Sequence, residues 1–383
     1  MDTSDVFLGA EAESVAAPAA SGLTIDVDTI DRTDISALTS QPDVVAIAPS
    51  IPMRLIAPFE NGVAPLPAEQ GVAWGVKVVG ADTSPFSGNG IVVAVLDTGI
   101  DATHPAFAGI DIVQKDFTGE GDGDQNGHGT HCAGTIFGRT TEGLRIAVAP
   151  GVKKVLIGKV IGQQGGSSDK IGSAILWAVE NGAHVISMSL GIDFPGLVKR
   201  LQDDGFPAEL ATSRALEGYR ANVQFFQSLA SLIQARGAFL QTTMIIAAAG
   251  NESRREVRPD FEIAVSPPAV AEGIISVAAL GQGDGGLVSA SFSNTGANVS
   301  GPGVAITSAK LGGGLTAKSG TSMATPHVAG VTALWAEKIK SGSGALPSLV
   351  LKTRLLGSAT SNGLKPGFDL FDVGLGLIRA PQE

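Results

Sequence analysis

Continuous apolar runs of six or seven residues restrict the fold of this chain more than any other feature of its sequence. They are rich in Val, Ile and Ala and show no alternation of apolar and polar residues. Such runs are typical of strands that are buried on both faces of a parallel sheet. They occupy residues 91–96, 155–160, 184–190, 244–249 and 274–279.

Helix-compatible stretches separate these runs. Residues 128–137 and 171–181 form two of them, and a longer amphipathic stretch carries an apolar stripe from Leu216 to Ile233 and ends at Gly237. Strands that alternate with helices in this way predict an α/β fold, with a mainly parallel multi-stranded sheet and helices on both of its faces. The stretch 193–211 is longer than an ordinary strand-to-helix connection, so we expect either a functional lobe or a surface loop there.

Composition narrows the classes of partner. The 383 residues are 44% hydrophobic and carry a formal net charge of −11, without a basic cluster, which argues against nucleic acid and anionic membranes as partners. No apolar run approaches the length of a membrane span. Cys132 is the only cysteine, which excludes an intrachain disulfide and a zinc site with several cysteines.

The N-terminal part differs from the rest of the chain. Residues 1–21 lack any strand or helix period and are expected to form a mobile tail, and residues 22–65 predict a small α+β unit with a linker, followed by the main domain at 66–383. The first 22 residues do not have the pattern of a signal peptide, so we expect a cytoplasmic protein, or a secreted one if a leader is missing from this sequence.

A candidate nucleophile lies where a small-residue turn leads into a helix-compatible run. Gly320 and Thr321 precede Ser322, and Pro326 is expected within the first helical turn, where a missing N–H costs little. The unpaired amides of a helix N-terminus favour a developing oxyanion. A serine at this position is more often only a helix cap, so the segment alone does not establish catalysis.

Three further residues complete a catalytic set. Asp97 ends the run 91–96, His128 opens a helix after a glycine turn, and Asn251 follows the run 244–249. Each has an ordinary structural role as well, in a strand-end turn or a helix cap. Together with Ser322, however, they supply the nucleophile, general base, orienting carboxylate and oxyanion donor of acyl transfer, and the carboxyl ends of parallel strands would bring them to one edge of the sheet.

Five strings occur along the sequence in the order VAVLDTGID, NGHGTHCAGT, MSLG, AAAGNE and GTSMATPHVAG. Together they resemble the subtilisin family of serine peptidases, over roughly residues 72–380. The resemblance implies a serine endopeptidase with Asp97, His128 and Ser322 as its triad and Asn251 in its oxyanion hole, and no required cofactor.

The resemblance also implies how a polypeptide substrate binds. Two edge segments would pair with an extended substrate, and residues near Ser266 would close the pocket for the side chain at the scissile position. These walls are small or apolar, so we expect large apolar side chains first, basic ones second, reaching Asp193 or Glu252, and acidic ones last. The substrate-binding residues are Ser189, Leu190, Gly191, Gly165, Gly166, Ser167, Ala248, Ala249 and Gly250.

The small N-terminal unit resembles the inhibitory pro-segment of the same family. This resemblance implies that the chain's own N-terminal segment is an intramolecular inhibitor, removed by self-cleavage within 57–71. In an alternative, residues 53–58 lie uncut across the cleft, as a short extension does in intracellular subtilisins.

The sequence departs from the family at its calcium sites. Ala106 and Thr141 replace ligands of the tight calcium site, which is therefore expected to be absent. The loop 116–126 resembles weaker calcium loops, which makes Asp122 and Asp124 candidate ligands. Cys132 is expected to be a small packed residue one turn beyond His128.

Two other functions remain open alongside hydrolysis. In a transpeptidase or macrocyclase, a lobe such as 193–211 would shield the acyl-enzyme from water. A non-catalytic peptide-binding module would keep the cleft without turnover, but the complete set of four residues argues against that function.

Overall fold

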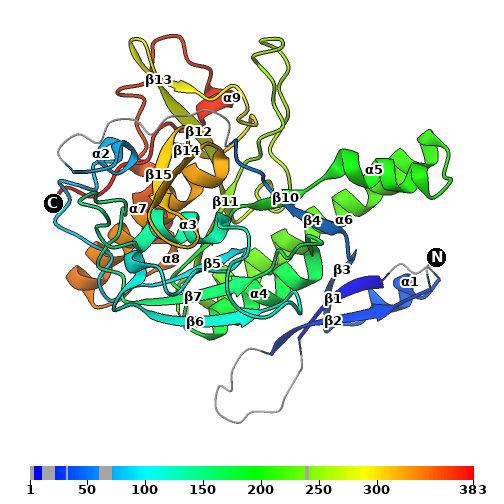
Figure 1. Ribbon diagram of the computed structural model, residues 1–383. Coiled ribbons are helices and arrows are strands. Elements are labelled where there is room, and N and C mark those ends of the chain that lie inside the picture. The colour runs from blue at the N-terminus through cyan, green and yellow to red at the C-terminus, as the bar shows by residue number, and fades with distance from the viewer. Residues whose placement is uncertain (1–3, 11–21, 32, 60–70, 238–240) are drawn as a thin grey trace.

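The fold is a central sheet between two layers of helices, with a smaller sheet from the N-terminal residues at one side (Figure 1). The computed structural model describes residues 4–10, 22–31, 33–59, 71–237 and 241–383. The expected α/β fold with a mainly parallel sheet is confirmed.

The main sheet has the strand order β13-β12-β11-β9-β5-β7-β6, and β14 also pairs with β12. All neighbouring pairs are parallel except β12 with β13. The central strands are buried along their length, as expected for apolar runs covered on both faces. The strands are β5 (Val92–Asp97), β6 (Asp111–Asp116), β7 (Lys154–Lys159), β9 (Val185–Met188), β11 (Met244–Ala248), β12 (Ile274–Gly283), β13 (Gly286–Ser289) and β14 (Val299–Pro302).

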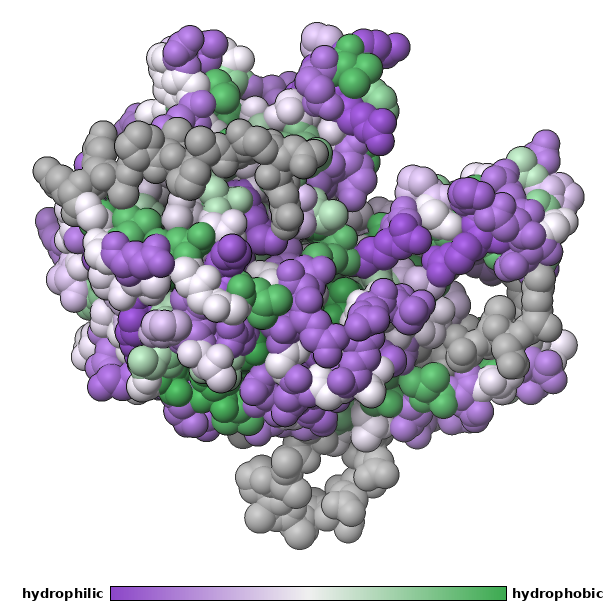
Figure 2. Space-filling model, viewed as in Figure 1, coloured by the Kyte–Doolittle hydropathy of each residue, from purple (hydrophilic) through white to green (hydrophobic). Residues whose placement is uncertain are grey.

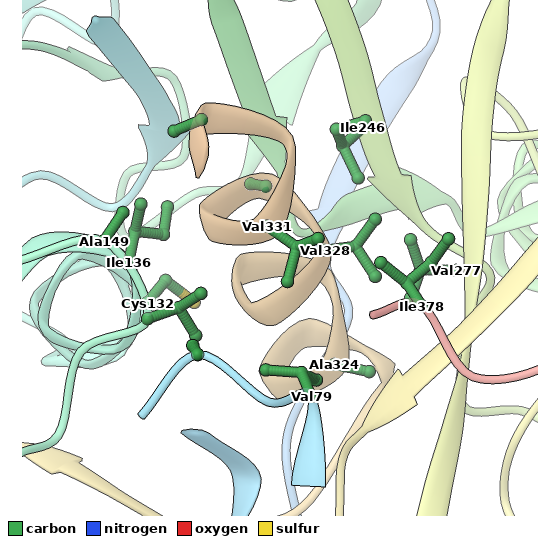
Figure 3. Close-up of a cluster of buried hydrophobic side chains, with 14 of the residues drawn as sticks. Val79, Cys132, Ile136, Ala149, Ile246, Val277, Ala324, Val328, Val331 and Ile378 are labelled. Carbon is green, nitrogen blue, oxygen red and sulfur yellow. The ribbon is translucent and has the colours of Figure 1, made fainter. Parts of the chain in front are cut away.

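One face of this sheet is covered by α3 (His128–Phe137) and α7 (Thr321–Ser343), which also pack against each other. Figure 3 shows their core, in which Val328 and Val331 of α7 lie between Ile136 of α3 and Val277 of β12. The opposite face is covered by α4 (Ser168–Glu180) and α6 (Ala208–Gly237). The two helices that begin with His128 and Thr321 therefore share one layer, which brings their N-termini together.

Shorter elements complete the fold around the main sheet. Strands β15 (Ile306–Ala309) and β16 (Leu315–Lys318) form an antiparallel hairpin that packs on α3. Further helical elements are α2 (Trp74–Val78), the 3₁₀ turn η1 (Pro105–Phe107), α8 (Ser348–Gly357) and α9 (Leu370–Val373).

The N-terminal unit is an antiparallel sheet of order β2-β1-β3 with the short helix α1 (Ile35–Leu38). Its strands are β1 (Ser4–Ala10), β2 (Leu23–Thr29) and β3 (Val44–Pro49). The prediction of a mobile tail is wrong for residues 4–10, because β1 lies in the centre of this sheet and pairs with both neighbours. Backbone hydrogen bonds hold a central strand whatever its side-chain pattern, so the lack of alternation misled the prediction. The rest of the predicted tail lies outside the described residues.

The N-terminal sheet continues directly into the main domain. After β3, strand β4 (Pro52–Leu55) inserts between β8 (Gly166–Ser167) and β10 (Leu190–Ile192) and pairs antiparallel with both. Helix α6 packs along β3, and the buried Asn222 of α6 donates a hydrogen bond to the Pro49 carbonyl at 2.9 Å. The N-terminal unit is thus anchored at both α6 and the β8/β10 edges.

The long connection after β10 forms a helical lobe. Helix α5 (Phe194–Asp203) follows β10 directly and packs on the first half of α6, and α5 with this part of α6 projects from the body of the molecule (Figure 1). The face of this lobe seen in Figure 2 is mainly hydrophilic. Among the helices in the described part of the chain, none combines the length and apolar character needed to cross a bilayer.

Candidate active site

Asp97 and His128 form a buried pair at the carboxyl edge of the sheet. Asp97 is the last residue of β5 and His128 is the first of α3, and the two side chains are 1% and 0% exposed. His128 Nδ1 lies 2.8 Å from Asp97 Oδ1. Burial alone would lower the pKa of His128, but the adjacent Asp97 carboxylate outweighs it and raises that pKa well above the ordinary value of 6.5.

A network centred on Asp124 holds this pair in place. One Asp124 oxygen accepts hydrogen bonds from the Gly127 amide and the Thr98 hydroxyl, and the other accepts both the amide and the hydroxyl of Thr130. Thr98 in turn accepts the Gly129 amide. The network therefore connects the end of β5 to the first turn of α3, the two elements that carry Asp97 and His128.

Ser322 lies in the first turn of α7, fully buried in this structure. The sequence predicted Pro326 within the first helical turn, but Pro326 is the sixth residue of the helix. Its missing N–H would have bonded to the Ser322 carbonyl, four residues earlier. That carbonyl instead accepts the Ser189 hydroxyl at 3.2 Å and the Cys132 thiol at 3.4 Å. Cys132 is buried, and burial raises the pKa of its thiol, so it remains a neutral donor.

Asn251 is oriented by Thr321. Its side-chain oxygen accepts both the backbone amide and the hydroxyl of Thr321, each at 2.9 Å. Because a backbone N–H can only donate, this pair assigns the amide oxygen, and the Asn251 NH₂ group points into the cleft. Gly320 leaves room for it, since a Cβ there would lie 2.9 Å from Asn251 Nδ2.

The chain's own residues 52–59 run across these groups. Upstream, Arg54 pairs with Gly191 and Met53 with Gly166, so both edge segments predicted to bind a peptide do contact one. Downstream, Phe59 exchanges backbone hydrogen bonds with Ser319 at 2.7 and 3.2 Å. Between them, the Ser322 hydroxyl donates to the Ile56 carbonyl at 2.9 Å and Asn251 Nδ2 donates to the Ala57 carbonyl at 3.0 Å.

Ile56 fills the position expected for the specificity pocket. It is 4% exposed and lies against Gly191, where a Cβ would meet Ile56 at 3.5 Å and the Ser266 hydroxyl at 3.1 Å. The Ile56 amide donates to the Ser189 carbonyl at 3.4 Å. Leu190 pairs with Leu55, and the Met53 carbonyl comes close to Gly165. Ser167, at the end of the other edge, pairs with Pro52.

The wall after β11 contributes mainly through its backbone. Ala248 is the last residue of β11, and the Ala249 carbonyl accepts the Ser266 amide at 3.4 Å beneath the pocket. The Gly250 amide donates to the Thr321 hydroxyl at 3.2 Å. The two carboxylates expected at the pocket rim are both engaged elsewhere, since Glu252 accepts the Asn294 side chain at 2.7 Å and Asp193 pairs with Arg54 at 2.6 Å.

Beside Leu55 the cleft widens into an open cavity of about 650 Å³. Its lining is mostly polar, so it differs from the apolar pocket that holds Ile56. The cavity is lined by Arg54, Thr98, Glu120, Gln125, Asn126, Lys159, Ile161 and residues 162–165.

The two candidate calcium ligands, Asp122 and Asp124, make different contacts in the structure. Asp124 uses both oxygens for the protein hydrogen bonds described above, including a further bond from the Asn126 amide at 2.9 Å. Asp122 lines a shallow hollow on the surface and has no such role among the described contacts. Among the described residues, the one group of three clustered side chains of metal-binding type is Asp97, His128 and Cys132, and the hydrogen bonds of this site already explain it.

Several residues of the site were missed in the sequence. Thr98, Thr130 and Thr321 hold Asp97, His128 and Asn251 through their hydroxyls. Thr98 and Thr130 lie within two residues of Asp97 and His128, and Thr321 directly precedes Ser322, so a position next to a candidate catalytic residue was the available signal. The pair of Arg54 and Asp193 joins residues that are 139 positions apart in the sequence and left no such signal.

The arrangement has the parts of a serine hydrolase, with a hydroxyl at a helix start, a buried imidazole–carboxylate pair and an amide donor facing the same peptide. The model of the subtilase family (Peptidase_S8) matches residues 88–376. The chain is 34% identical over 274 residues to the thermostable alkaline protease of Halalkalibacterium halodurans and 33% identical over 320 residues to subtilisin Savinase of Lederbergia lenta. The chain therefore belongs to the subtilase family.

The extent of these similarities differs. The match covers 69% of this chain and 63% of the alkaline protease, and 81% of this chain and 98% of Savinase. Fervidolysin from Fervidobacterium pennivorans, a keratinolytic enzyme related to subtilisin, superposes with a TM-score of 0.68 at 23% identity, over 98% of this chain and 60% of fervidolysin. That structure supports the fold, including its mainly parallel sheet.

Proposed function

We propose that this protein is a serine endopeptidase and that its own residues 52–59 occupy and inhibit its cleft. The observation that carries the proposal is a peptide in extended conformation that contacts Ser322 and Asn251 at 2.9 and 3.0 Å, next to the buried pair of Asp97 and His128. Family membership supports the same activity.

In the proposed mechanism, Ser322 Oγ attacks the scissile carbonyl carbon while His128 Nε2 takes the hydroxyl proton. Asp97 keeps Nδ1 protonated and stabilises the imidazolium. The oxyanion is stabilised by Asn251 Nδ2 and the Ser322 backbone N–H. When the C–N bond breaks, His128 gives its proton to the leaving amine, and a water molecule deprotonated by His128 then releases the acyl group.

Ser322 and Asn251 contact two different carbonyls of the segment, whereas catalysis needs both at one scissile carbonyl. This division of contacts supports inhibition rather than cleavage. A productive substrate places a single carbonyl with its carbon at Ser322 Oγ and its oxygen at Asn251. Here the hydroxyl donates to Ile56 and the amide donates to Ala57. His128 Nε2 consequently lacks a hydrogen-bond partner among the described residues. The bond that follows the Ala57 carbonyl is, moreover, a tertiary amide to Pro58, whose ring restricts the backbone.

Two expectations were stated for the N-terminal segment, namely self-cleavage within residues 57–71 and an uncut segment that lies across the cleft. The contacts of residues 52–59 favour a segment that blocks the cleft without being cut at residues 56–58. Self-cleavage further along the linker, in residues 60–70, concerns residues outside those that the structure describes and stays a prediction. Helix α5 stands apart from α7 in Figure 1, which favours hydrolysis over an acyl-enzyme covered by this lobe.

The proposal is tested by treating the full chain with a fluorophosphonate and locating the adduct by mass spectrometry. We expect labelling of Ser322, and none in Ser322→Ala, while Ser341→Ala, an exposed serine of the same helix, labels as the wild type does. His128→Ala should lose as much activity as Ser322→Ala, and the double variant little more, because triad residues act as a unit. Additive losses, or labelling at another serine, would refute the assignment.

Peptide products then separate the alternatives. Hydrolysed fragments support an endopeptidase, ligated or cyclised fragments support a transpeptidase, and binding without turnover supports a peptide-binding module. Asn251→Ala should lower kcat by roughly 10²–10³ with little change in KM, a magnitude that carries over from subtilisin, a member of the same family.

A further inference from the structure

Arg54 and Asp193 form an ion pair within the cleft that the proposed mechanism does not use. Arg54 Nη1 lies 2.6 Å from Asp193 Oδ2. Arg54 is the second residue before Ile56, whose side chain lies against Gly191 and Ser266. Counting Ile56 as the first position on the N-terminal side of the scissile bond, Leu55 takes the second position and Arg54 the third.

Because of the pairing of β4 with β10, any side chain in the place of Arg54 would lie near Asp193. Arg54 lies opposite Gly191, and Asp193 follows two residues later, directly after the last residue of β10. Diagonal neighbours on antiparallel strands lie within reach of long side chains. Any peptide that binds β10 in the register of β4 therefore brings its third side chain toward Asp193.

Asp193 is held in place independently of Arg54. It is the N-cap of α5, and its Oδ1 accepts the Gly196 amide at 3.0 Å. Gly196 allows this close approach, because a Cβ there would lie 2.0 Å from Asp193 Oδ2. The cap uses Oδ1 and leaves Oδ2 for a cation, and the side chain of Asp193 is only 25% exposed. The carboxylate is thus pre-positioned at the root of the α5–α6 lobe.

We propose that Asp193 is a specificity-determining residue that selects peptides with Arg or Lys at the third position before the scissile bond. This inference rests on the proposed endopeptidase function and narrows its substrate class. It also replaces the expectation that Asp193 would receive a basic side chain from the first position. Arg54 gives the chain's own inhibitory segment the residue that this subsite prefers.

The exposure of the Arg54 side chain limits how strongly the third residue should change kcat/KM. The Arg54 side chain is 60% exposed, and exposed ion pairs contribute modestly and are screened by salt. We expect Arg at this position to raise kcat/KM about two- to fivefold over norleucine, a neutral residue of similar length. Glu should fall below norleucine, because like charges would face each other across the strand pair.

The test is a competition between three peptides, acetyl-Pro-Met-Xaa-Leu-Ile-Ala-Gly-amide, with Xaa as Arg, norleucine or Glu. The full-length chain cleaves them in one mixture, and mass spectrometry follows each product. The ratio of products reports the ratio of kcat/KM values and does not depend on how much of the enzyme is blocked by its own N-terminal segment. We expect the order Arg, norleucine, Glu, with the differences shrinking at high salt.

Asp193→Asn is the decisive variant, because Asn caps a helix as well as Asp and only the charge is lost. We expect this variant to cleave the three peptides at nearly equal rates. Asp203→Asn is the matched control, since it removes the same charge from the other end of α5, where Asp203 pairs with Lys199, and it should keep the preference. Equal cleavage by the wild type, or an unchanged preference in Asp193→Asn, would overturn the inference and leave the peptidase function intact.

Failure of the proposed function gives a different result, namely no cleavage of any peptide. Fluorophosphonate labelling of Ser322 then still tests the pair. Asp193→Asn and Arg54→Ala should each speed labelling by loosening the segment in the cleft, and the double variant should be no faster than either one. Additive acceleration would show that the two residues do not interact and would overturn the inference.

Discussion

At the scale of single residues, the site depends on groups whose ionisation and orientation come from their neighbours. Asp97 raises the pKa of His128 from within a buried pair, and Thr321 turns the Asn251 amide toward the cleft. Each supporting contact is a hydrogen bond of 2.8 or 2.9 Å. The proposed chemistry therefore reflects this local environment as much as the identity of the reacting residues.

The raised pKa of His128 predicts how activity responds to pH. The imidazole must be neutral to accept the Ser322 proton, so kcat/KM should fall as the pH decreases through a pKa above the ordinary value of 6.5. For stability the sign is opposite, since a raised pKa stabilises the fold at pH values below 6.5 and this stabilisation is lost as the pH rises through the folded pKa.

A pH profile of peptide cleavage measures this limb. In Asp97→Asn the limb should move to lower pH, because the carboxylate that stabilises the imidazolium is gone, and the plateau should also fall. Thr103→Ala serves as a control, since it lies near Asp101 on the exposed loop after β5 and should leave the limb in place. A limb at the same pH in Asp97→Asn would contradict the proposed coupling.

At the scale of elements, β4 directly follows the N-terminal unit in the sequence, but in the folded protein it lies in the cleft. Backbone pairing with β8 and β10 holds it as a substrate would be held, whatever most of its side chains are. What distinguishes it from a substrate is the chain that follows, where Ile56 and Ala57 divide the contacts of one scissile carbonyl and Pro58 comes next.

Pro58→Ala is predicted to turn the inhibitory segment into a substrate. The substitution restores an ordinary secondary amide after Ala57 and frees the backbone to shift a single carbonyl into both contacts. Incubation followed by intact-mass measurement should show cleavage within residues 56–58 on a timescale at which the wild type is uncut there. The same substitution combined with Ser322→Ala should remain whole.

Pro52→Ala is the matched control for this prediction. Pro52 begins β4 and pairs with Ser167, away from Ser322, so its replacement should not create a cut at residues 56–58. If Pro58→Ala also stayed intact at these bonds while cleaving other peptides, the block would have to come from the β4 register rather than from the proline.

At the scale of the whole molecule, the N-terminal unit is held in the cleft and also against α4 and α6 outside it. Strand β4 lies in the cleft, whereas β3 packs on α6, where Asn222 donates to the Pro49 carbonyl. Attachment at α6 would keep the proposed inhibitory segment at a high effective concentration at the cleft, even when β4 itself separates from it. Loosening the α6 contact should therefore raise activity without changing any group in the cleft.

Asn222→Ala tests this coupling. Loss of one buried hydrogen bond costs about 1 kcal/mol, so we expect the fraction of open cleft, and with it the initial rate of peptide cleavage, to rise about fivefold. Hydrogen exchange should become faster in β3 as well. Gln227→Ala, at a half-buried position on the same helix whose side chain donates to Glu272, should change neither measurement. Faster exchange in β3 with unchanged activity would contradict the prediction, because it would show that contact with α6 does not affect occupation of the cleft.

Much of this protein was determined by local sequence pattern. The apolar runs predicted the parallel strands because both faces of such strands must be buried, and α3 begins and ends at the predicted residues 128 and 137. The four candidate catalytic residues could be named because each follows a strand or opens a helix, and the topology of an α/β sheet brings those ends to one edge.

Tertiary structure decided what depends on distant pairs. Residues 4–10 form a strand only because β2 and β3 lie on either side, and Pro326 is tolerated within α7 because Ser189 and Cys132 satisfy the carbonyl that it leaves free. Asp193 meets Arg54 through the pairing of β4 with β10, and the division of contacts between Ile56 and Ala57 arises from the path of the chain across the cleft. A linear pattern records the periodicity of each element, whereas these features depend on the register and contacts between elements, which exist only once the chain has folded.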